Sequence, residues 1–343
     1  MSQIDILMPV PLPQLVRDAL GSRYKVHQLW LDADKEATLA RIAGDVRAIA
    51  TGAPILAEDM VYPISPALMQ RLPKLEIVAN LGVGYDNIDA QFAASHGICV
   101  TNTPDVLTEE TADTAFGLAL NAVRQFPRAE RYLRDGKWLT RPFELTASLR
   151  GRTMGILGLG RIGKAIAQRA EAFGVKVIYH SRNRASDVAY PYMDSLIAMA
   201  RACDILMIVV PGGPATRNIV NKEVLEALGS NGILINIARG TIVDEAALIE
   251  ALRNRTILSV GLDVFADEPR VPPELIAMDH VVLLPHVGSA SQATRDAMSQ
   301  LQVDNLDAWF SGTDVLTPVT ETADRNAISN ALAAARQTGK IKK

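Results

Sequence analysis

The sequence predicts an α/β protein built on two parallel sheets. Short runs of β-branched and aliphatic residues alternate with helical patterns almost throughout the chain, which is typical of βα units. The 343 residues are enough for two ordinary domains. A glycine-rich turn lies in mid-chain, after a complete first series of strand-like runs and directly after the first run of a second series.

Each series of runs predicts its own sheet. The first predicts about five strands, at residues 4–8, 24–29, 48–51, 76–79 and 98–101, with helical patterns such as residues 13–20 and 33–43 between them. The second predicts six strands, at residues 154–157, 175–179, 205–210, 233–237, 259–263 and 281–284. Six parallel strands match a dinucleotide-binding fold.

The segments outside the two series predict how the chain divides. Residues 109–150 predict a long helix and then an irregular arm, and residues 289–310 predict one helix. We expect that last helix to return to the first domain, which makes the first domain discontinuous. The expected parts are a substrate domain of residues 1–102 plus 288–320, a dinucleotide domain of residues 103–287 with its arm at about 122–150, and a tail of residues 321–343.

Composition and charge exclude several classes of function. The net charge of −3, from 35 basic and 38 acidic residues, gives no argument for binding nucleic acid or an anionic membrane. The two cysteines, Cys99 and Cys203, exclude a disulfide framework, and the histidines show no metal-ligand spacing. The N-terminus has no signal-peptide pattern and no apolar run is long enough to span a membrane, so we expect a cytoplasmic protein without a metal.

The glycine turn predicts a dinucleotide site. Gly158-Leu159-Gly160-Arg161-Ile162-Gly163 follows the strand at residues 154–157 and opens a helical pattern. The first glycine permits the tight turn, the second lets the backbone approach a pyrophosphate, and the third allows close packing of helix on strand. The helix N-terminus supplies unpaired N–H groups for the anion. We therefore expect two Rossmann-like domains, a flavodoxin-like substrate domain and a doubly wound dinucleotide domain, with a cleft between them.

The end of the second strand of this sheet indicates which dinucleotide binds. An NAD site usually has an acidic residue about twenty positions after the glycines, to accept from the ribose 2′-hydroxyl. Here the strand leads into Ser181-Arg182-Asn183-Arg184, and the next acid is Asp187. A hydroxyl and two guanidinium groups suit a 2′-phosphate. The sequence therefore favours NADP(H), the alternative being two solvated loop arginines.

Three polar residues follow three later strands of the second sheet. Arg239, Glu268 and His286 each come after a run that is predicted to be a parallel strand, and the carboxyl ends of such strands meet where ligands bind. Arg239 could clasp a carboxylate and polarise a ketone, and His286 could donate the proton that accompanies hydride transfer. Glu268 could hold the other imidazole nitrogen and favour the charged ring. The set predicts reduction of a 2-keto acid.

From about residue 4 to 320, the chain resembles the D-isomer-specific 2-hydroxyacid dehydrogenases. The resemblance is carried, in order, by residues 80–89 (Asn-Leu-Gly-Val-Gly-Tyr-Asp-Asn-Ile-Asp), the glycine loop, Asn236-Ile237-Ala238-Arg239-Gly240, residues 261–265 (Gly-Leu-Asp-Val-Phe), Asp267-Glu268-Pro269 and Leu284-Pro285-His286. Within that family, Ser181-Arg182-Asn183-Arg184 makes it most similar to the NADPH-dependent glyoxylate/hydroxypyruvate reductases.

The resemblance implies roles for further residues. It implies that Arg239 binds substrate, that Glu268 supports His286, and that His286 is the proton donor. The backbone N–H groups of Val83 and Gly84 would bind the substrate carboxylate. On the cofactor side, residues Leu159 to Ile162 would bind the pyrophosphate and Asp263 the nicotinamide carboxamide. Ile237 and Ala238 would line the nicotinamide pocket. The resemblance also implies a homodimer formed through the arm. The turn Pro211-Gly212-Gly213-Pro214 departs from the commoner family sequence, which leaves cofactor contacts there open.

The sequence thus predicts an NADP-dependent reductase of small 2-keto acids such as glyoxylate and hydroxypyruvate. Two alternatives stay open: an NAD-linked dehydrogenase for another substrate, and a nucleotide-sensing, co-repressor-like binding protein. The preferred 2-keto acid and the strictness of NADPH over NADH are left undecided. Trp138 in the arm either reaches the partner subunit's pocket or buries a dimer contact.

Overall fold

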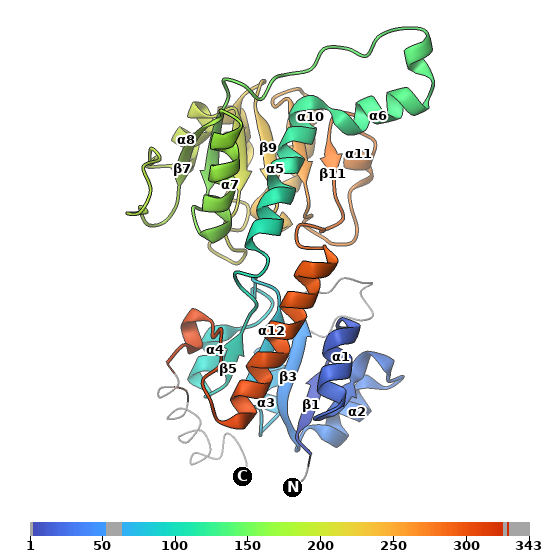
Figure 1. Ribbon diagram of the computed structural model, residues 1–343, viewed down its shortest axis with the longest axis vertical. Helices are drawn as coiled ribbons and strands as arrows, with labels where there is room; N and C mark the ends of the chain where they lie inside the picture. The colour runs from blue at the N-terminus through green and yellow to red at the C-terminus, as the bar shows by residue number, and fades with distance from the viewer. Residues whose placement is uncertain (1–2, 53–63, 325–327, 329–343) are drawn as a thin grey trace. The chain divides into compact units, whose positions relative to one another are not determined.

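The computed structural model describes residues 3–52, 64–324 and 328. The chain divides into two compact units, Met1–Leu107 with Gln292–Lys343 (unit 1) and Thr108–Ser291 (unit 2). Each unit contains one parallel sheet with helices on it (Figure 1). The predicted fold class, two parallel-sheet α/β domains, is confirmed.

Unit 1 has a five-stranded sheet in the order β2-β1-β3-β4-β5. Its strands are β1 (Asp5–Met8), β2 (Lys25–Gln28), β3 (Val46–Gly52), β4 (Ile77–Leu81) and β5 (Cys99–Thr101). Its helices are α1 (Gln14–Gly21), α2 (Lys35–Ile42), α3 (Pro66–Arg71), α4 (Ala90–Ser95) and α12 (Gln292–Ser311), with short 3₁₀ turns η1 (Leu29–Leu31) and η5 (Thr320–Thr322). This strand order is that of the flavodoxin-like doubly wound sheet.

Helix α12 belongs to unit 1 because it is bonded to the sheet there. Gln302, in the middle of the helix, is buried, and its Nε2 donates to the carbonyl oxygens of Thr51 and Ala79, both at 2.8 Å. Buried polar groups need such partners. These two bonds fix a C-terminal helix across strands β3 and β4 of the N-terminal sheet.

Unit 2 has a six-stranded sheet in the order β11-β10-β9-β8-β6-β7. Its strands are β6 (Thr153–Leu157), β7 (Lys176–His180), β8 (Ile205–Ile208), β9 (Ile233–Asn236), β10 (Ser259–Leu262) and β11 (Val282–Leu283). Its helices are α5 (Thr108–Arg124), α6 (Phe126–Arg134), α7 (Arg161–Ala172), α8 (Leu196–Ala202), α9 (Lys222–Leu228), α10 (Glu245–Arg253) and α11 (Pro273–Ile276), with 3₁₀ turns η3 (Lys137–Leu139) and η4 (Gly240–Ile242). After β6 the chain adds β7 on one side of it and then crosses to add β8 on the other side. Open α/β sheets bind ligands at such a point, where the order of strands changes direction.

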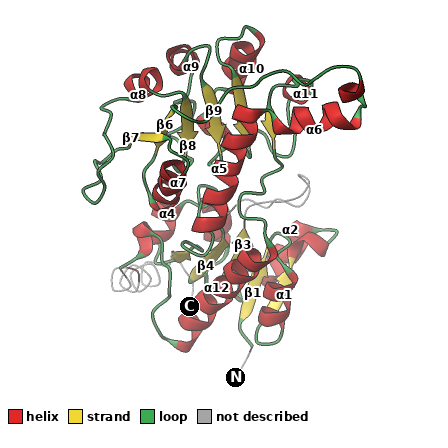
Figure 2. Ribbon diagram, turned by 45° about the horizontal axis from the view of Figure 1, so that its top comes forward, coloured by secondary structure: helices red, strands yellow, loops and turns green. Residues whose placement is uncertain are grey.

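Both faces of the unit 2 sheet are covered. Alternate residues of β8 go to opposite sides: Ile205 and Met207 pack with helices α5 and α7, and Leu206 and Ile208 pack with α8, α9 and α10. The same helices lie on the two faces in Figure 2. A strand buried on both faces reads as a continuous apolar run, which is why these strands were visible in the sequence.

The arm of unit 2 differs from the prediction in one respect. The long helix ends at Arg124, and Gln125 has a left-handed backbone with φ of 52°. A second helix, α6, then begins, where the sequence predicted an irregular segment. None of its residues is buried, and the arm stands out from the sheet of its unit (Figure 1).

The segment after α12 is described only in part. Thr322, in the predicted tail, is buried, and its hydroxyl oxygen accepts from the Val100 N–H at 3.0 Å. Most of the predicted tail lies outside the described residues. Within the described ranges, no helix is long and apolar enough to cross a membrane, and no three His, Cys, Asp or Glu side chains could hold a metal ion.

Candidate active site

The loops that carry Glu268 and His286 follow neighbouring strands and meet at the carboxyl ends of the unit 2 sheet. Strands β9, β10 and β11 are adjacent and parallel, and Arg239, Glu268 and His286 lie in the loops that follow them. The imidazole Nδ1 of His286 is 2.7 Å from Oε2 of Glu268. A carboxylate there accepts the Nδ1 proton, which leaves Nε2 as the ring nitrogen that can face a substrate.

The surroundings of Glu268 favour its ionised form. Burial works to raise its pKa, but its hydrogen bonds and the neighbouring charges, those of His286 foremost, together lower the pKa below its ordinary 4.5. The Phe265 N–H, which donates to Oε1 at 3.0 Å, and the charge of Arg239 act in the same direction. Glu268 is therefore a carboxylate that orients the imidazole.

Asp263 holds the turn that carries His286. It is buried at the end of β10, and its two oxygens accept from the N–H groups of Val287 at 2.7 Å and Gly288 at 2.8 Å. Burial raises its pKa, although both N–H groups oppose this. His286 itself has a left-handed backbone, with φ of 54°. The two bonds stabilise this uncommon conformation; the implied nicotinamide contact of Asp263 stays a prediction.

The loop that carries Arg239 is fixed by a residue that the sequence did not single out as a site residue. Asn236 is buried at the end of β9; its Oδ1 accepts from the Ala238 N–H at 3.0 Å and its Nδ2 donates to the Arg239 carbonyl at 2.8 Å. A Cβ on Gly240 would lie 1.8 Å from the carbonyl carbon of Phe265. The loops after β9 and β10 are therefore in backbone contact, which brings Arg239 close enough to influence Glu268.

The glycine turn has the geometry of an anion site. Gly158 has φ of 97°, and a Cβ on Gly163 would lie 2.3 Å from the Gly158 carbonyl oxygen, so both positions require glycine. A Cβ on Gly160 would meet no protein atom within 4 Å. Helix α7 begins at Arg161 without a side-chain cap. A helix N-terminus without a side-chain cap, next to space that a glycine leaves open, suits an anion such as a pyrophosphate.

The turn after β7 presents two arginines to solvent. Arg182, Asn183 and Arg184 are exposed. The hydroxyl of Ser181 donates to the Asn183 carbonyl at 2.6 Å, within the turn itself. The guanidinium of Arg184 lies over the ring of Tyr192, 5.9 Å from its centre. No carboxylate occupies the position where an NAD site would have one.

The remaining predicted site residues lie elsewhere. Val83 and Gly84 are in unit 1, after β4, where Asn102 donates to the Val83 carbonyl at 2.8 Å and Asn80 to the Gly84 carbonyl at 3.0 Å. These bonds fix the backbone whose N–H groups the resemblance assigns to a substrate carboxylate. That role stays a prediction. In unit 2, Ile237 and Ala238 directly follow β9.

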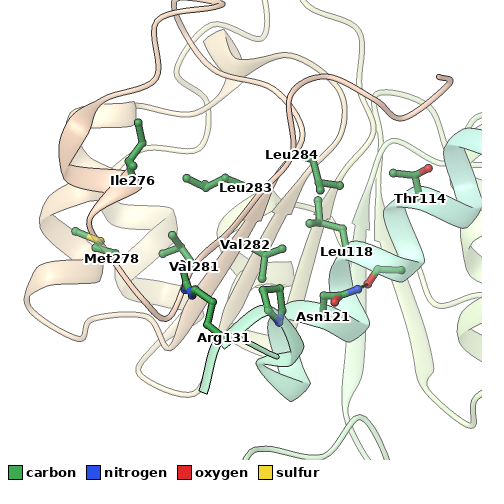
Figure 3. Close-up of a pocket in the computed structure, with 12 residues that line it drawn as sticks. Thr114, Leu118, Asn121, Arg131, Ile276, Met278, Val281, Val282, Leu283 and Leu284 are labelled. Atoms are coloured by element: carbon green, nitrogen blue, oxygen red, sulfur yellow. Dashed lines mark hydrogen bonds between the residues drawn. The ribbon is translucent and has the colours of Figure 1, made fainter. Parts of the chain in front are cut away.

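A cavity of about 540 Å³ in unit 2 is lined by other residues. Thr114, Leu118 and Asn121 of α5 line one side, and Ile276 and Met278 line the other (Figure 3). Arg239, Glu268 and His286 are not among the residues that line it. This cavity is therefore distinct from the candidate active site.

Comparison with known proteins gives relatives that match most of the chain. The model of the D-isomer specific 2-hydroxyacid dehydrogenase NAD binding domain matches residues 116–288. Glyoxylate/hydroxypyruvate reductase A of Arabidopsis thaliana is 44% identical over 93% of this chain and all of its own length. Hydroxyphenylpyruvate reductase of Plectranthus scutellarioides is 42% identical over the same shares.

Solved structures resemble the chain over a similar length. The NADPH-dependent glyoxylate/hydroxypyruvate reductase of Sinorhizobium meliloti, in complex with NADP and malonate, is 48% identical, with a TM-score of 0.85 over 94% of this chain and 98% of its own. A 2-hydroxyacid dehydrogenase of Ketogulonicigenium vulgare is 38% identical, with a TM-score of 0.85 over 93% and 99%. The chain therefore belongs to the D-isomer-specific 2-hydroxyacid dehydrogenase family.

Proposed function

We propose that this protein is an NADPH-dependent reductase of small 2-keto acids, with glyoxylate and hydroxypyruvate as its substrates. The observation that carries the proposal is the His286–Glu268 pair, 2.7 Å apart, at the carboxyl edge of a dinucleotide-binding sheet. Relatives named as glyoxylate/hydroxypyruvate reductases, at 44% and 48% identity, support the substrate class.

The three catalytic side chains have separate roles. The planar fork of Arg239 binds the substrate carboxylate through two N–H groups and polarises the neighbouring carbonyl. His286 donates the Nε2 proton to the carbonyl oxygen, and Glu268 keeps the ring oriented and stabilises its charged form. Bound NADPH supplies the hydride. The result is a 2-hydroxy acid.

The residues present fit NADP(H). The uncapped N-terminus of α7 and the open space at Gly160 suit the pyrophosphate. Arg182 and Arg184, both exposed, supply guanidinium groups for a 2′-phosphate. A site that selects NAD would need a carboxylate at the end of β7, and the nearest acid that follows, Asp187, is ion-paired with Lys164.

A cofactor and substrate panel tests the proposal. The purified chain is assayed with NADPH and with NADH against glyoxylate, hydroxypyruvate, pyruvate, hydroxyphenylpyruvate and 2-ketogluconate. We expect the highest kcat/KM with NADPH and glyoxylate or hydroxypyruvate. A preference for NADH would support the NAD-linked alternative, whereas cofactor binding without turnover of any substrate would support a nucleotide-sensing protein.

We also propose that two copies associate through the arm. Five large apolar side chains of residues 126–145 are exposed: Phe126, Leu133, Trp138, Leu139 and Leu145. A run of this kind is uncommon on the surface of a monomer. The cavity between α5 and Met278 offers an apolar surface in the same unit (Figure 3). A second copy of this chain is the partner that the family resemblance implies.

A further inference from the structure

The turn that carries Ser181 and Arg184 is closed by a chain segment that returns along β7. The Tyr179 N–H donates to the Pro191 carbonyl at 3.0 Å, and the Met193 N–H donates to the Tyr179 carbonyl at 2.8 Å. Tyr192 thus pairs with Tyr179 as a parallel bridge at the outer side of this edge strand. Both ends of the intervening loop are therefore fixed to the same strand.

One side chain contacts two residues of the turn. The Tyr192 hydroxyl donates to the Ser181 carbonyl at 3.2 Å, and the Arg184 guanidinium lies over the Tyr192 ring, 5.9 Å from its centre. The Tyr192 ring is itself held edge-on against Tyr179, with centres 5.4 Å apart and an interplanar angle of 66°. Tyr192 therefore links the first and the fourth residue of the turn to the sheet.

A second tyrosine fixes the residue that follows Arg184. Tyr179 is fully buried, and its hydroxyl accepts from the Ala185 N–H at 3.0 Å and lies 3.4 Å from the Ala185 carbonyl oxygen. A phenol can donate and accept at once. The backbone on the C-terminal side of Arg184 is thus tied to the hydrophobic core of the unit.

These contacts position Arg184 and do not engage the N–H groups of its guanidinium. A guanidinium held over an aromatic ring by cation–π attraction keeps its N–H groups available for a ligand. An exposed arginine otherwise loses rotamer freedom when it binds a ligand, and holding it in place beforehand lowers that cost. Because NADPH differs from NADH only by the 2′-phosphate, this cost affects one cofactor and not the other.

We propose that Tyr192 is a positioning residue for cofactor selection, which holds Arg184 and the Ser181 backbone where a 2′-phosphate binds. The inference rests on the proposed preference for NADPH. It assigns part of that preference to a residue that does not contact the phosphate itself. Tyr179 supports the same turn from the core side.

The test compares kcat/KM for NADPH and for NADH in the wild type, Y192F and Y192L. Y192F keeps the ring under Arg184 and loses the bond to Ser181, so the NADPH-to-NADH ratio should fall about two- to fivefold. Y192L loses both contacts, and the ratio should fall about tenfold. The change should appear in the KM for NADPH rather than in kcat.

A matched control is the same substitution at Tyr190, on the returning segment. Its hydroxyl donates to Glu171 of α7 at 2.8 Å rather than to the turn at 181–184, so Y190F should keep the wild-type ratio. An unchanged ratio in Y192L, in a folded protein that prefers NADPH as the wild type, would overturn the inference. A wild type without preference for NADPH would overturn the proposed function instead, so the two failures are distinguishable.

Discussion

A substitution at Arg239 can separate the effect of the positive charge from the effect of the planar guanidinium shape. R239K keeps a positive charge but loses the planar fork that binds a carboxylate through two N–H groups. We expect kcat/KM for the 2-keto acid to fall by about 10- to 100-fold, the loss typical of a charge-assisted hydrogen bond. The KM for NADPH should change little. Steady-state kinetics measures both, and a lysine variant with wild-type kcat/KM would contradict the role of Arg239.

Glu268 makes the stability of the folded protein depend on pH. Its pKa in the folded protein lies below the ordinary value of 4.5, because the partners of the carboxylate, His286 foremost, together outweigh the effect of burial. A carboxylate with a depressed pKa stabilises the fold above its unfolded pKa, and this contribution is lost as the pH falls through the folded pKa. We therefore expect the wild type to have a higher Tm than E268Q at pH 6, with a difference that shrinks below pH about 4.5.

Thermal melts of both proteins between pH 6 and pH 3 measure this difference. E274Q is a suitable control, because Glu274 is a surface residue paired with Arg253 at 3.7 Å, and surface pairs contribute little. A Tm difference between the wild type and E268Q that stays constant across this range would contradict the ion pair.

At the residue scale, the sequence predicted the candidate catalytic residues but not the side chains that fix the loops carrying them. Arg239, Glu268 and His286 each follow a strand, so strand prediction alone places them at one edge. The bonds of Asn236 and the cation–π contact of Arg184 with Tyr192 depend on how each loop turns back. No periodic pattern encodes those turns. Asn236, a polar residue at the end of a buried aliphatic run, is the one signal that could have been followed.

At the scale of elements, two glycines of the turn before α7 predict different effects of the same substitution, to alanine. A Cβ on Gly163 would meet the Gly158 carbonyl at 2.3 Å, so G163A should separate α7 from β6 and destabilise the protein by about 1–3 kcal/mol. A Cβ on Gly160 would meet no protein atom, so G160A should change stability by less than about 0.5 kcal/mol. It should nevertheless weaken NADPH binding, because the methyl group occupies the space proposed for the pyrophosphate.

Chemical denaturation and a fluorescence titration with NADPH distinguish the two variants. The expected pattern is loss of stability for G163A and loss of affinity alone for G160A. Unchanged NADPH affinity in G160A would show that the cofactor does not approach this turn.

Strands were easier to predict than the arm. Each of the eleven predicted strands is observed, with ends that shift by at most two residues. Strands buried on both faces give continuous apolar runs with turn residues between them. Helix α6 was missed although Phe126 and Leu133, seven residues apart, lie on the same helical face, which the structure leaves exposed. The break at Gln125 had a sequence signal in Pro127, which disrupts a helix interior but is tolerated in the first turn of the next helix.

At the scale of the whole molecule, the proposed homodimer makes a prediction about the arm. Leu139 is 92% exposed at the end of η3, and L139E would place a charge in a buried dimer contact. We expect L139E to shift the protein from dimer towards monomer. L31E is the matched control, because Leu31 is 71% exposed and belongs to unit 1, not to the arm, so that it should leave the assembly unchanged.

Sedimentation velocity over a range of concentrations reports the assembly of both variants. A wild type that stays monomeric at every concentration would contradict the proposed dimer. A dimer that L139E leaves intact would contradict the arm as its contact.

The two-sheet organisation could be predicted because each series of strands is contiguous in the sequence. The return of α12 to unit 1 followed from the need to bury a helix that comes after the second sheet. The bonds of Gln302 to Thr51 and Ala79 join residues more than 200 positions apart. Such pairings depend on the assembled sheet, so they could not be read from the pattern of one segment.

The measurement that tests the central claim most directly is hydroxypyruvate reduction by the wild type and H286A, with NADPH binding measured on the same samples. If His286 donates the proton, H286A should bind NADPH as tightly as the wild type but turn over about 10²- to 10⁴-fold more slowly. Near-normal turnover by H286A, or no turnover by the wild type, would contradict the account.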